Sequence, residues 1–152
     1  MWAACGLTSN IIRGGFNMFS VHKTYNLFIS HSWNYSDQYT TIDKWLQESS
    51  IDYNNYSVTH DNPIETRSDR VLREKITEQI KHASVVIILS GMYVSHSNWI
   101  QYEVDEAISF GKPILAIVPR GNERIPLSVS KNASKIVYWN KESVIGGIKS
   151  LL

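Results

Sequence analysis

The residues best placed to do chemistry in this sequence are a tryptophan and a glutamate, Trp99 and Glu103. They are four positions apart, a spacing at which two side chains share one face of an α-helix. That face differs from the apolar stripe of the same segment, so both side chains could border a ligand crevice, where the glutamate would supply a carboxylate. The alternative from spacing alone is a solvated helix acid beside a half-buried tryptophan.

Most other chemistry is excluded by missing motifs. The sequence contains no G-x-G-x-x-G after its first apolar run, no G-x-x-x-x-G-K-[ST] and no G-x-S-x-G, which excludes the usual dinucleotide, P-loop and α/β-hydrolase sites. The first run ends in Ser30-His31-Ser32, where a receiver domain has carboxylates and a flavodoxin has a glycine-containing phosphate loop. The five histidines show no metal-ligand spacing, and Cys5 is the only cysteine, so no metal site is expected.

Composition predicts one folded domain. The chain has 152 residues, is 43% hydrophobic and 11% aromatic, and carries a formal net charge of +1. This balance excludes disorder and gives no electrostatic reason to expect a nucleic acid or a membrane surface as partner. The longest apolar runs, such as Val85–Leu89 and Ile114–Val118, are too short to span a bilayer. A single cysteine and the absence of a secretory signal favour the cytoplasm.

Strand-like and helix-like segments alternate from residue 25 onward. Short β-rich or apolar runs predict strands at Tyr25–Ser30, Tyr56–His60, Ser84–Ser90, Ile114–Val118 and Ile136–Trp139. Apolar residues at helical spacing predict helices at Ser36–Glu48, Asp69–His82, Asn98–Phe110 and Lys141–Leu152. The third helix has Ser97 as its expected N-cap, Gly111 as its C′ glycine, and an apolar stripe of Ile100, Val104, Ala107 and Ile108. The segment Pro119–Lys135 is expected to be a loop.

This alternation predicts a three-layer α/β sandwich of the flavodoxin-like class, with a five-stranded, mostly parallel sheet in the order 2-1-3-4-5. In that order the winding reverses between strands 1 and 3, so a ligand crevice should open above their carboxyl ends. The residues expected there are Ser30–Trp33 and Ser90–Met92. The helix that carries Trp99 and Glu103 is expected beside the same crevice.

The first twenty residues differ from the rest of the chain. Residues 1–20 mix glycine, serine, asparagine and single apolar residues without a regular period, so we expect an N-terminal arm followed by one domain over residues 21–152. The alternative is a short helix over Leu7–Arg13 that packs on the domain.

Three segments resemble the motifs of TIR domains. They are Tyr25–Ser32, which is similar to the opening strand of that family, Ser97–Glu103, which is similar to its Ser-x-Trp-x-x-x-Glu helix start, and Gly111–Ile114. Further matches at Phe28–Trp33, Ile80–Ile87 and Tyr138–Asn140 resemble the TIR-like group of bacterial Thoeris anti-phage defence. The resemblance covers about Tyr25–Leu152.

The resemblance implies a TIR-like fold and an enzyme that consumes NAD⁺ as its substrate, with no separate cofactor. It implies that Glu103 is catalytic and cleaves the bond between nicotinamide and ribose. Trp99 would then wall the pocket or serve only for packing, and Ser30, His31, Ser32 and Trp33 would line the adenine or ribose end. His31 either contacts the ligand or is an ordinary surface imidazole.

The same resemblance implies a signalling role. The product would be a cyclic ADP-ribose isomer that activates a separate effector, so the two proteins would be coupled through the nucleotide rather than by stable binding. Self-association and a phage-derived trigger are expected. The alternative is a non-catalytic TIR-like adaptor that acts by protein–protein interaction. A Glu103 carboxylate held near Ser30–Trp33 favours the enzyme, whereas a Glu103 directed to bulk solvent favours the adaptor.

Overall fold

The computed structural model describes residues 23–30, 36–57, 69–90, 93–121 and 125–152. The strands are β1 Thr24–Ser30, β2 Asp52–Asn55, β3 Val85–Leu89, β4 Ile114–Val118 and β5 Lys135–Tyr138. The helices are α1 Ser36–Gln47, α2 Asp69–His82, α3 Tyr93–Ser109, α4 Leu127–Asn132 and α5 Lys141–Ser150. The arm expected over residues 1–20, and its alternative helix, lie outside the described residues.

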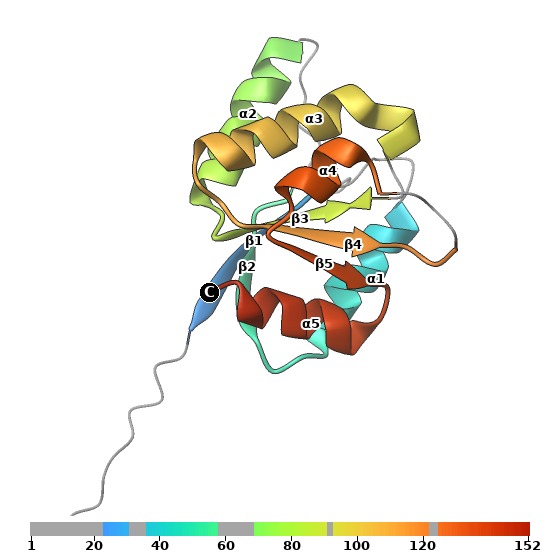
Figure 1. Cartoon of the computed structure of the whole chain (residues 1–152). Helices are drawn as coiled ribbons and strands as arrows, with labels where there is room; N and C mark the ends of the chain where they lie inside the picture. Colours follow the sequence, from blue (N-terminus) through green and yellow to red (C-terminus); the bar gives the residue numbers. More distant parts are fainter. Residues whose placement is uncertain (1–22, 31–35, 58–68, 91–92, 122–124) are drawn as a thin grey trace, which may run out of the picture.

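The five strands form one parallel sheet in the order β2-β1-β3-β4-β5, which confirms the predicted topology. Helices α1 and α5 cover one face of this sheet, and α2, α3 and α4 cover the other (Figure 1). No helix in the described ranges has the length and apolar character needed to cross a membrane.

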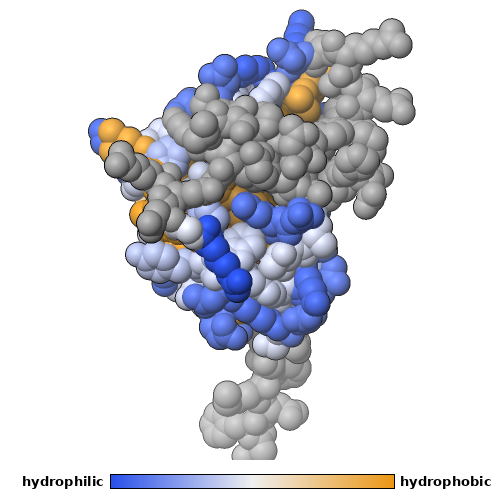
Figure 2. Space-filling view, turned by 90° about the vertical axis from the view of Figure 1, so that its right-hand side faces the viewer, coloured by the Kyte–Doolittle hydropathy of each residue, from blue (hydrophilic) through white to orange (hydrophobic). Residues whose placement is uncertain are grey.

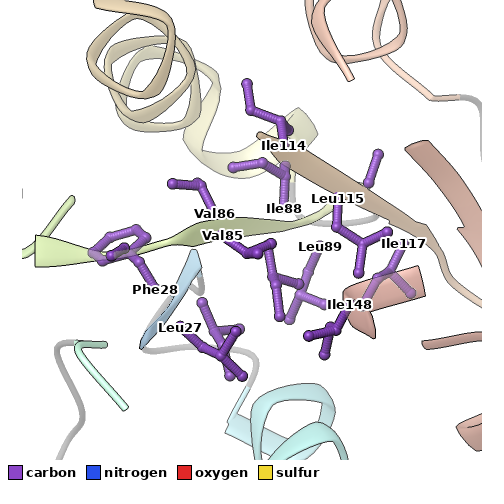
Figure 3. Packing of buried hydrophobic residues seen from close by; sticks show 14 of the residues in the cluster. Leu27, Phe28, Val85, Val86, Ile88, Leu89, Ile114, Leu115, Ile117 and Ile148 are labelled. Atoms are coloured by element: carbon purple, nitrogen blue, oxygen red, sulfur yellow. The ribbon is translucent and has the colours of Figure 1, made fainter. Parts of the chain in front are cut away.

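The core lies on both faces of the central strand β3, whose five residues are all buried. Because successive side chains of a strand point to opposite faces, alternate residues of each strand pack on different helices. In Figure 3, Val86, Ile88 and Ile114 lie on one side of the sheet, and Leu27, Leu115 and Ile148 lie on the other. Strand register pairs Phe28 with Val86 and Ser30 with Ile88, so these residues of β1 face the α2/α3 layer.

The second strand lies earlier in the sequence than expected. Strand β2 is Asp52–Asn55 rather than Tyr56–His60, and it pairs with β1 along the edge of the sheet. An edge strand with exposed residues needs no apolar run, so the pattern gave no signal there. Tyr56 and Ser57 still bond to β1 beyond the strand end, through the Tyr56 N–H to the Leu27 carbonyl and the Ile29 N–H to the Ser57 hydroxyl.

Helix α3 also departs from expectation. It begins at Tyr93 rather than Asn98, so the expected N-cap Ser97 lies inside it. Its buried stripe is Ile100, Glu103, Val104 and Ala107, whereas Ile108 is 49% exposed. The buried face of the helix therefore includes Glu103 and leaves out Ile108, which the sequence places in the apolar stripe. The helix ends as predicted, with Gly111 at a positive φ of 62°.

The segment expected to be a loop between β4 and β5 contains the short helix α4. Only Val129 of this helix is buried, and a helix of six residues is too short to show a reliable period. The expectations for α2 and β4 match the observed bounds.

Candidate active site

A serine and a glutamate meet at the carboxyl end of β1. Ser30 is the last residue of that strand, and Glu103 lies on α3, which covers the face toward which Ser30 points. The Ser30 hydroxyl donates a hydrogen bond to Oε2 of Glu103. Both side chains are buried, with exposed fractions of 2% for Ser30 and 7% for Glu103. The structure thus brings together two of the residues that the sequence singled out, 73 positions apart.

Burial controls the charge of this carboxyl group. Removal from water raises the pKa of Glu103 from 4.5 to about 7, while the hydrogen bond from Ser30 acts in the opposite direction. No lysine or arginine in the described ranges forms an ion pair with Glu103. The group therefore changes charge near neutral pH, which is typical of carboxyl groups in functional sites.

These observations exclude one of the two interpretations left open for Glu103. A solvated helix acid would be exposed and would keep an ordinary pKa, and Glu103 does neither. A catalytic role for Glu103 stays a prediction, because the hydrogen bond and the burial describe the resting protein.

Trp99 is half-buried in a cluster that joins α2 to α3. The guanidinium carbon of Arg73 lies 5.0 Å from the Trp99 ring centroid and 4.6 Å from that of Tyr102. The two rings meet edge to face, with centroids 6.3 Å apart. The Tyr102 hydroxyl is hydrogen-bonded to that of Thr77 at 2.5 Å. Packing by Trp99 is therefore observed, and its contact with a substrate stays a prediction.

Sequence reasoning missed Arg73 and Tyr102 as neighbours of Trp99. Tyr102 was within the motif region, but nothing in the spacing of α2 indicated which of its cations would reach α3. Such a contact depends on how the two helices cross, and that is a property of the packed structure.

The structure describes only some of the other expected site residues. His31, Ser32 and Trp33 lie outside the described residues, as do Gly91 and Met92. Ser90 is buried, and its hydroxyl donates to the carbonyl of Ile117 in β4 at 2.7 Å. Within the described ranges, no three histidine, cysteine, aspartate or glutamate side chains gather as a metal site would require.

Solved structures share this fold. A conserved protein from Enterococcus faecalis V583 is 13% identical, with a TM-score of 0.63 and coverage of 86% of this chain and 100% of that one. The CMP N-glycosidase BcmB from Clostridium botulinum is also 13% identical, with a TM-score of 0.52 and coverage of 82% and 98%. At this identity the two comparisons establish the fold alone. The comparison with curated proteins found no match.

The parallel sheet, together with a buried glutamate on the helix after its central strand, defines a flavodoxin-like α/β domain with a carboxyl group near the sheet edge where ligands of this fold bind. The model of one particular family, described as the TIR-like domain of the Thoeris protein ThsB, matches residues 28–124. The match spans more than half of the chain, so the protein belongs to the ThsB TIR-like family. The matched range includes both Ser30 and Glu103.

Proposed function

We propose that this protein is a nucleotide-processing enzyme that cleaves NAD⁺ between nicotinamide and ribose. The observation that carries the proposal is the buried Glu103 carboxyl group, held by Ser30 at the carboxyl end of a central strand. Ligands of open parallel sheets bind at that edge. Membership of the ThsB TIR-like family supports the proposal. The fold is also compatible with such chemistry, since a CMP N-glycosidase shares it.

One carboxylate is enough for this reaction. The bond between the ribose C1′ and the pyridinium nitrogen breaks, and its electron pair leaves with nicotinamide, which becomes neutral. No general acid is needed for that departure. The ribose acquires oxocarbenium character, and an anionic Glu103 stabilises the positive charge as it develops. Burial strengthens this interaction because little water competes with it.

The oxocarbenium-like centre is then captured by a nucleophile. Attack by water gives ADP-ribose and a proton. Attack by a nucleophilic group of the same ADP-ribose gives a cyclic isomer, nicotinamide and a proton. We propose the cyclic outcome, with the product acting as a signal to a separate effector in anti-phage defence. The family assignment supports this finer proposal.

Ser30 would act as a positioning residue in this mechanism. Its hydroxyl donates to Oε2, which fixes one oxygen of Glu103 and leaves the other free to face a ribose. Trp99, one helical turn before Glu103, would form a wall of the pocket.

The substitution that tests the proposal is Glu103→Gln, which keeps the shape of the side chain and removes its negative charge. Loss of one well-placed electrostatic partner costs on the order of 10²–10³ in rate. The measurement is nicotinamide release by purified, activated full-length protein. Glu106→Gln, one turn further along α3, is the matched control and should keep most of the activity. If Glu103→Gln folds and turns over at the parental rate, the catalytic proposal fails and the adaptor becomes the better explanation.

We also propose that the protein is active only when several copies associate, so its activity should depend on assembly. We expect the isolated protein to be nearly inactive until a phage-derived trigger or high concentration assembles it. A dilution series with parallel light-scattering measurements tests this. Vigorous turnover by a monomeric sample would contradict it.

A further inference from the structure

An arginine of α2 lies beside the candidate active site. The guanidinium carbon of Arg73 is 5.0 Å from the ring centroid of Trp99. Trp99 precedes Glu103 by four residues on α3, which is about 6 Å along the helix axis. Helix α3 begins on the side toward which the strands point (Figure 1), so Trp99 lies closer than Glu103 to the sheet edge where ligands of this fold bind. Arg73 is thus one ring contact and one helical turn from Glu103.

The guanidinium of Arg73 lacks a polar partner in the described part of the chain. It forms no ion pair there, and the hydrogen bond that joins Arg73 to the Tyr102 hydroxyl uses the backbone carbonyl of Arg73. By contrast, Arg70 of the same helix is paired with Glu74, with Nε and Oε1 2.9 Å apart. Since an arginine side chain carries five N–H donors, Arg73 keeps them available for a ligand.

Two aromatic rings hold this cation in place. The guanidinium carbon is 4.6 Å from the ring centroid of Tyr102, and the rings of Trp99 and Tyr102 meet at 90°. Tyr102 is itself fixed by the 2.5 Å hydrogen bond between its hydroxyl and that of Thr77 on α2. Cation–π attraction to both rings therefore restrains the guanidinium, and a side chain that is already restrained loses less conformational freedom when it binds an anion.

The surface around Arg73 is open to water. Its side chain is exposed, whereas Trp99 and Tyr102 are half-buried. Helix α2 begins at the top of the molecule (Figure 1), and the described surface at the top of Figure 2 is mainly hydrophilic. A charged ligand can therefore reach Arg73 from solvent.

This placement matches the substrate of the proposed reaction. A guanidinium presents parallel N–H donors that match two oxygens of a phosphate. In NAD⁺ the diphosphate is bonded through O5′ to the ribose whose C1′ would face Glu103, so a single ribose separates the phosphate from the reacting carbon. That span is comparable with the single helical turn between Trp99, which carries Arg73 on its ring, and Glu103.

We infer that Arg73 binds the diphosphate of NAD⁺ and so makes the site prefer a dinucleotide to a nucleoside. The inference rests on the proposed NAD⁺ cleavage, because the ribose bound at Glu103 brings the diphosphate to Arg73. Arg73 is a substrate-binding residue in this scheme and takes no part in breaking the glycosidic bond.

The first test is calorimetric titration of the full chain with ADP-ribose, which carries the diphosphate and requires no turnover. We expect Arg73→Gln to weaken binding about tenfold to a hundredfold, since a hydrogen bond between charged groups is lost. Arg73→Lys keeps the charge without the paired donors and should recover part of the affinity. Arg70→Gln, which removes the same charge from the same helix, should bind like the parent.

The second test compares two substrates that share the scissile bond. NAD⁺ carries the diphosphate, and nicotinamide riboside has no phosphate. With activated full-length protein, Arg73→Gln should raise KM for NAD⁺ about tenfold or more while kcat stays unchanged, because binding is lost equally from the ground state and the transition state. The same variant should leave kcat/KM for nicotinamide riboside unchanged, whereas a merely structural role would lower the turnover of both substrates.

The inference is overturned if the parent shows no saturable binding of ADP-ribose, or if Arg73→Gln slows both substrates equally. It is also overturned if Thr77→Val, which loosens the same helix pair and keeps the charge, weakens binding as much as Arg73→Gln. Equal slowing of both substrates, with Glu103→Gln inactive on both, would leave the proposed cleavage intact. Conversely, Arg73-dependent binding of ADP-ribose by a protein that cleaves neither substrate would contradict the proposed function and keep the phosphate site.

Discussion

The two faces of the sheet are filled in different ways. Under α1 and α5, side chains such as Leu27, Leu115 and Ile148 form an apolar layer. Under α2 and α3, the same strand alternation places Ser30 beneath Glu103. In the described part of the chain, Glu103 is the one buried residue among the aspartates, glutamates, lysines, arginines and histidines.

This difference distinguishes side chains that stabilise the fold from a side chain that is a candidate for chemistry. An apolar face stabilises the fold by removing carbon from water, whereas a buried carboxyl group without a cation costs free energy of folding. The Ser30 hydrogen bond offsets part of that cost, yet the pKa of Glu103 stays raised. A group retained at such a cost, at the sheet edge where ligands of this fold bind, is a candidate for chemistry.

The largest expected effect concerns stability against pH. Because folding raises the pKa of Glu103 from 4.5 to about 7, the protonated form is favoured in the folded state. Stability from this group is fully present below pH 4.5 and is lost as pH rises through about 7. The loss is on the order of 3 kcal/mol. Urea unfolding of parent and Glu103→Gln between pH 5 and 8 should show the variant gaining on the parent as pH rises. A constant difference would mean that the buried carboxyl does not titrate in this range.

The next effect concerns activity against pH. If the anion of Glu103 is the catalytic form, kcat/KM should rise with pH, with a midpoint near the pKa of about 7. Below that midpoint the rate should fall about tenfold for each pH unit. Nicotinamide release measured across the neutral range tests this, with Glu106→Gln expected to give the parental profile. A profile that falls with rising pH would instead assign the protonated carboxyl to the reaction.

The apolar face can be tested with two adjacent glycines of α5. A Cβ at position 147 would lie 3.0 Å from Cδ1 of Leu115 and 3.1 Å from Cγ1 of Val137, both buried. The crowding of a methyl group at position 147 costs about 1–3 kcal/mol, which offsets the gain of about 1 kcal/mol in helix propensity, so Gly147→Ala should be clearly less stable than Gly146→Ala. A Cβ at position 146 meets nothing within 4 Å, so Gly146→Ala should stabilise the helix by about 0.5–1 kcal/mol. Thermal unfolding of the two variants measures the difference in stability. Equal effects would show that the side chains around position 147 can move to accept a methyl group.

The smallest effect concerns the cluster between α2 and α3. Arg73→Gln removes the cation that lies over Trp99 and Tyr102, and should cost about 0.5–1 kcal/mol, since the side chain is exposed. Arg70→Gln is the control, because Arg70 pairs only with the exposed Glu74 one turn away. Urea unfolding monitored by tryptophan fluorescence measures both. A larger loss in Arg70→Gln would mean that the aromatic contacts contribute little.

Local patterns were sufficient for much of the fold. Apolar residues at helical spacing predicted the helix Asp69–His82, which is α2, and a β-rich apolar run predicted the strand Ser84–Ser90, which contains β3. The alternation of strands and helices then restricts the sheet to a few possible strand orders, and the order observed is 2-1-3-4-5. These predictions succeed because each depends on residues close together in the chain.

Features that depend on distant residues were decided by tertiary structure. Strand β2 is defined by backbone pairing with β1 rather than by its own side chains. The spacing of Trp99 and Glu103 indicated a shared helix face, but both a solvated and a buried glutamate fit that spacing. The orientation of α3 on the sheet decided between them, because it turns Glu103 inward onto Ser30, a residue 73 positions earlier. Periodicity along one helix reports its faces, and only the packing of the whole domain determines which face is buried and what it meets there.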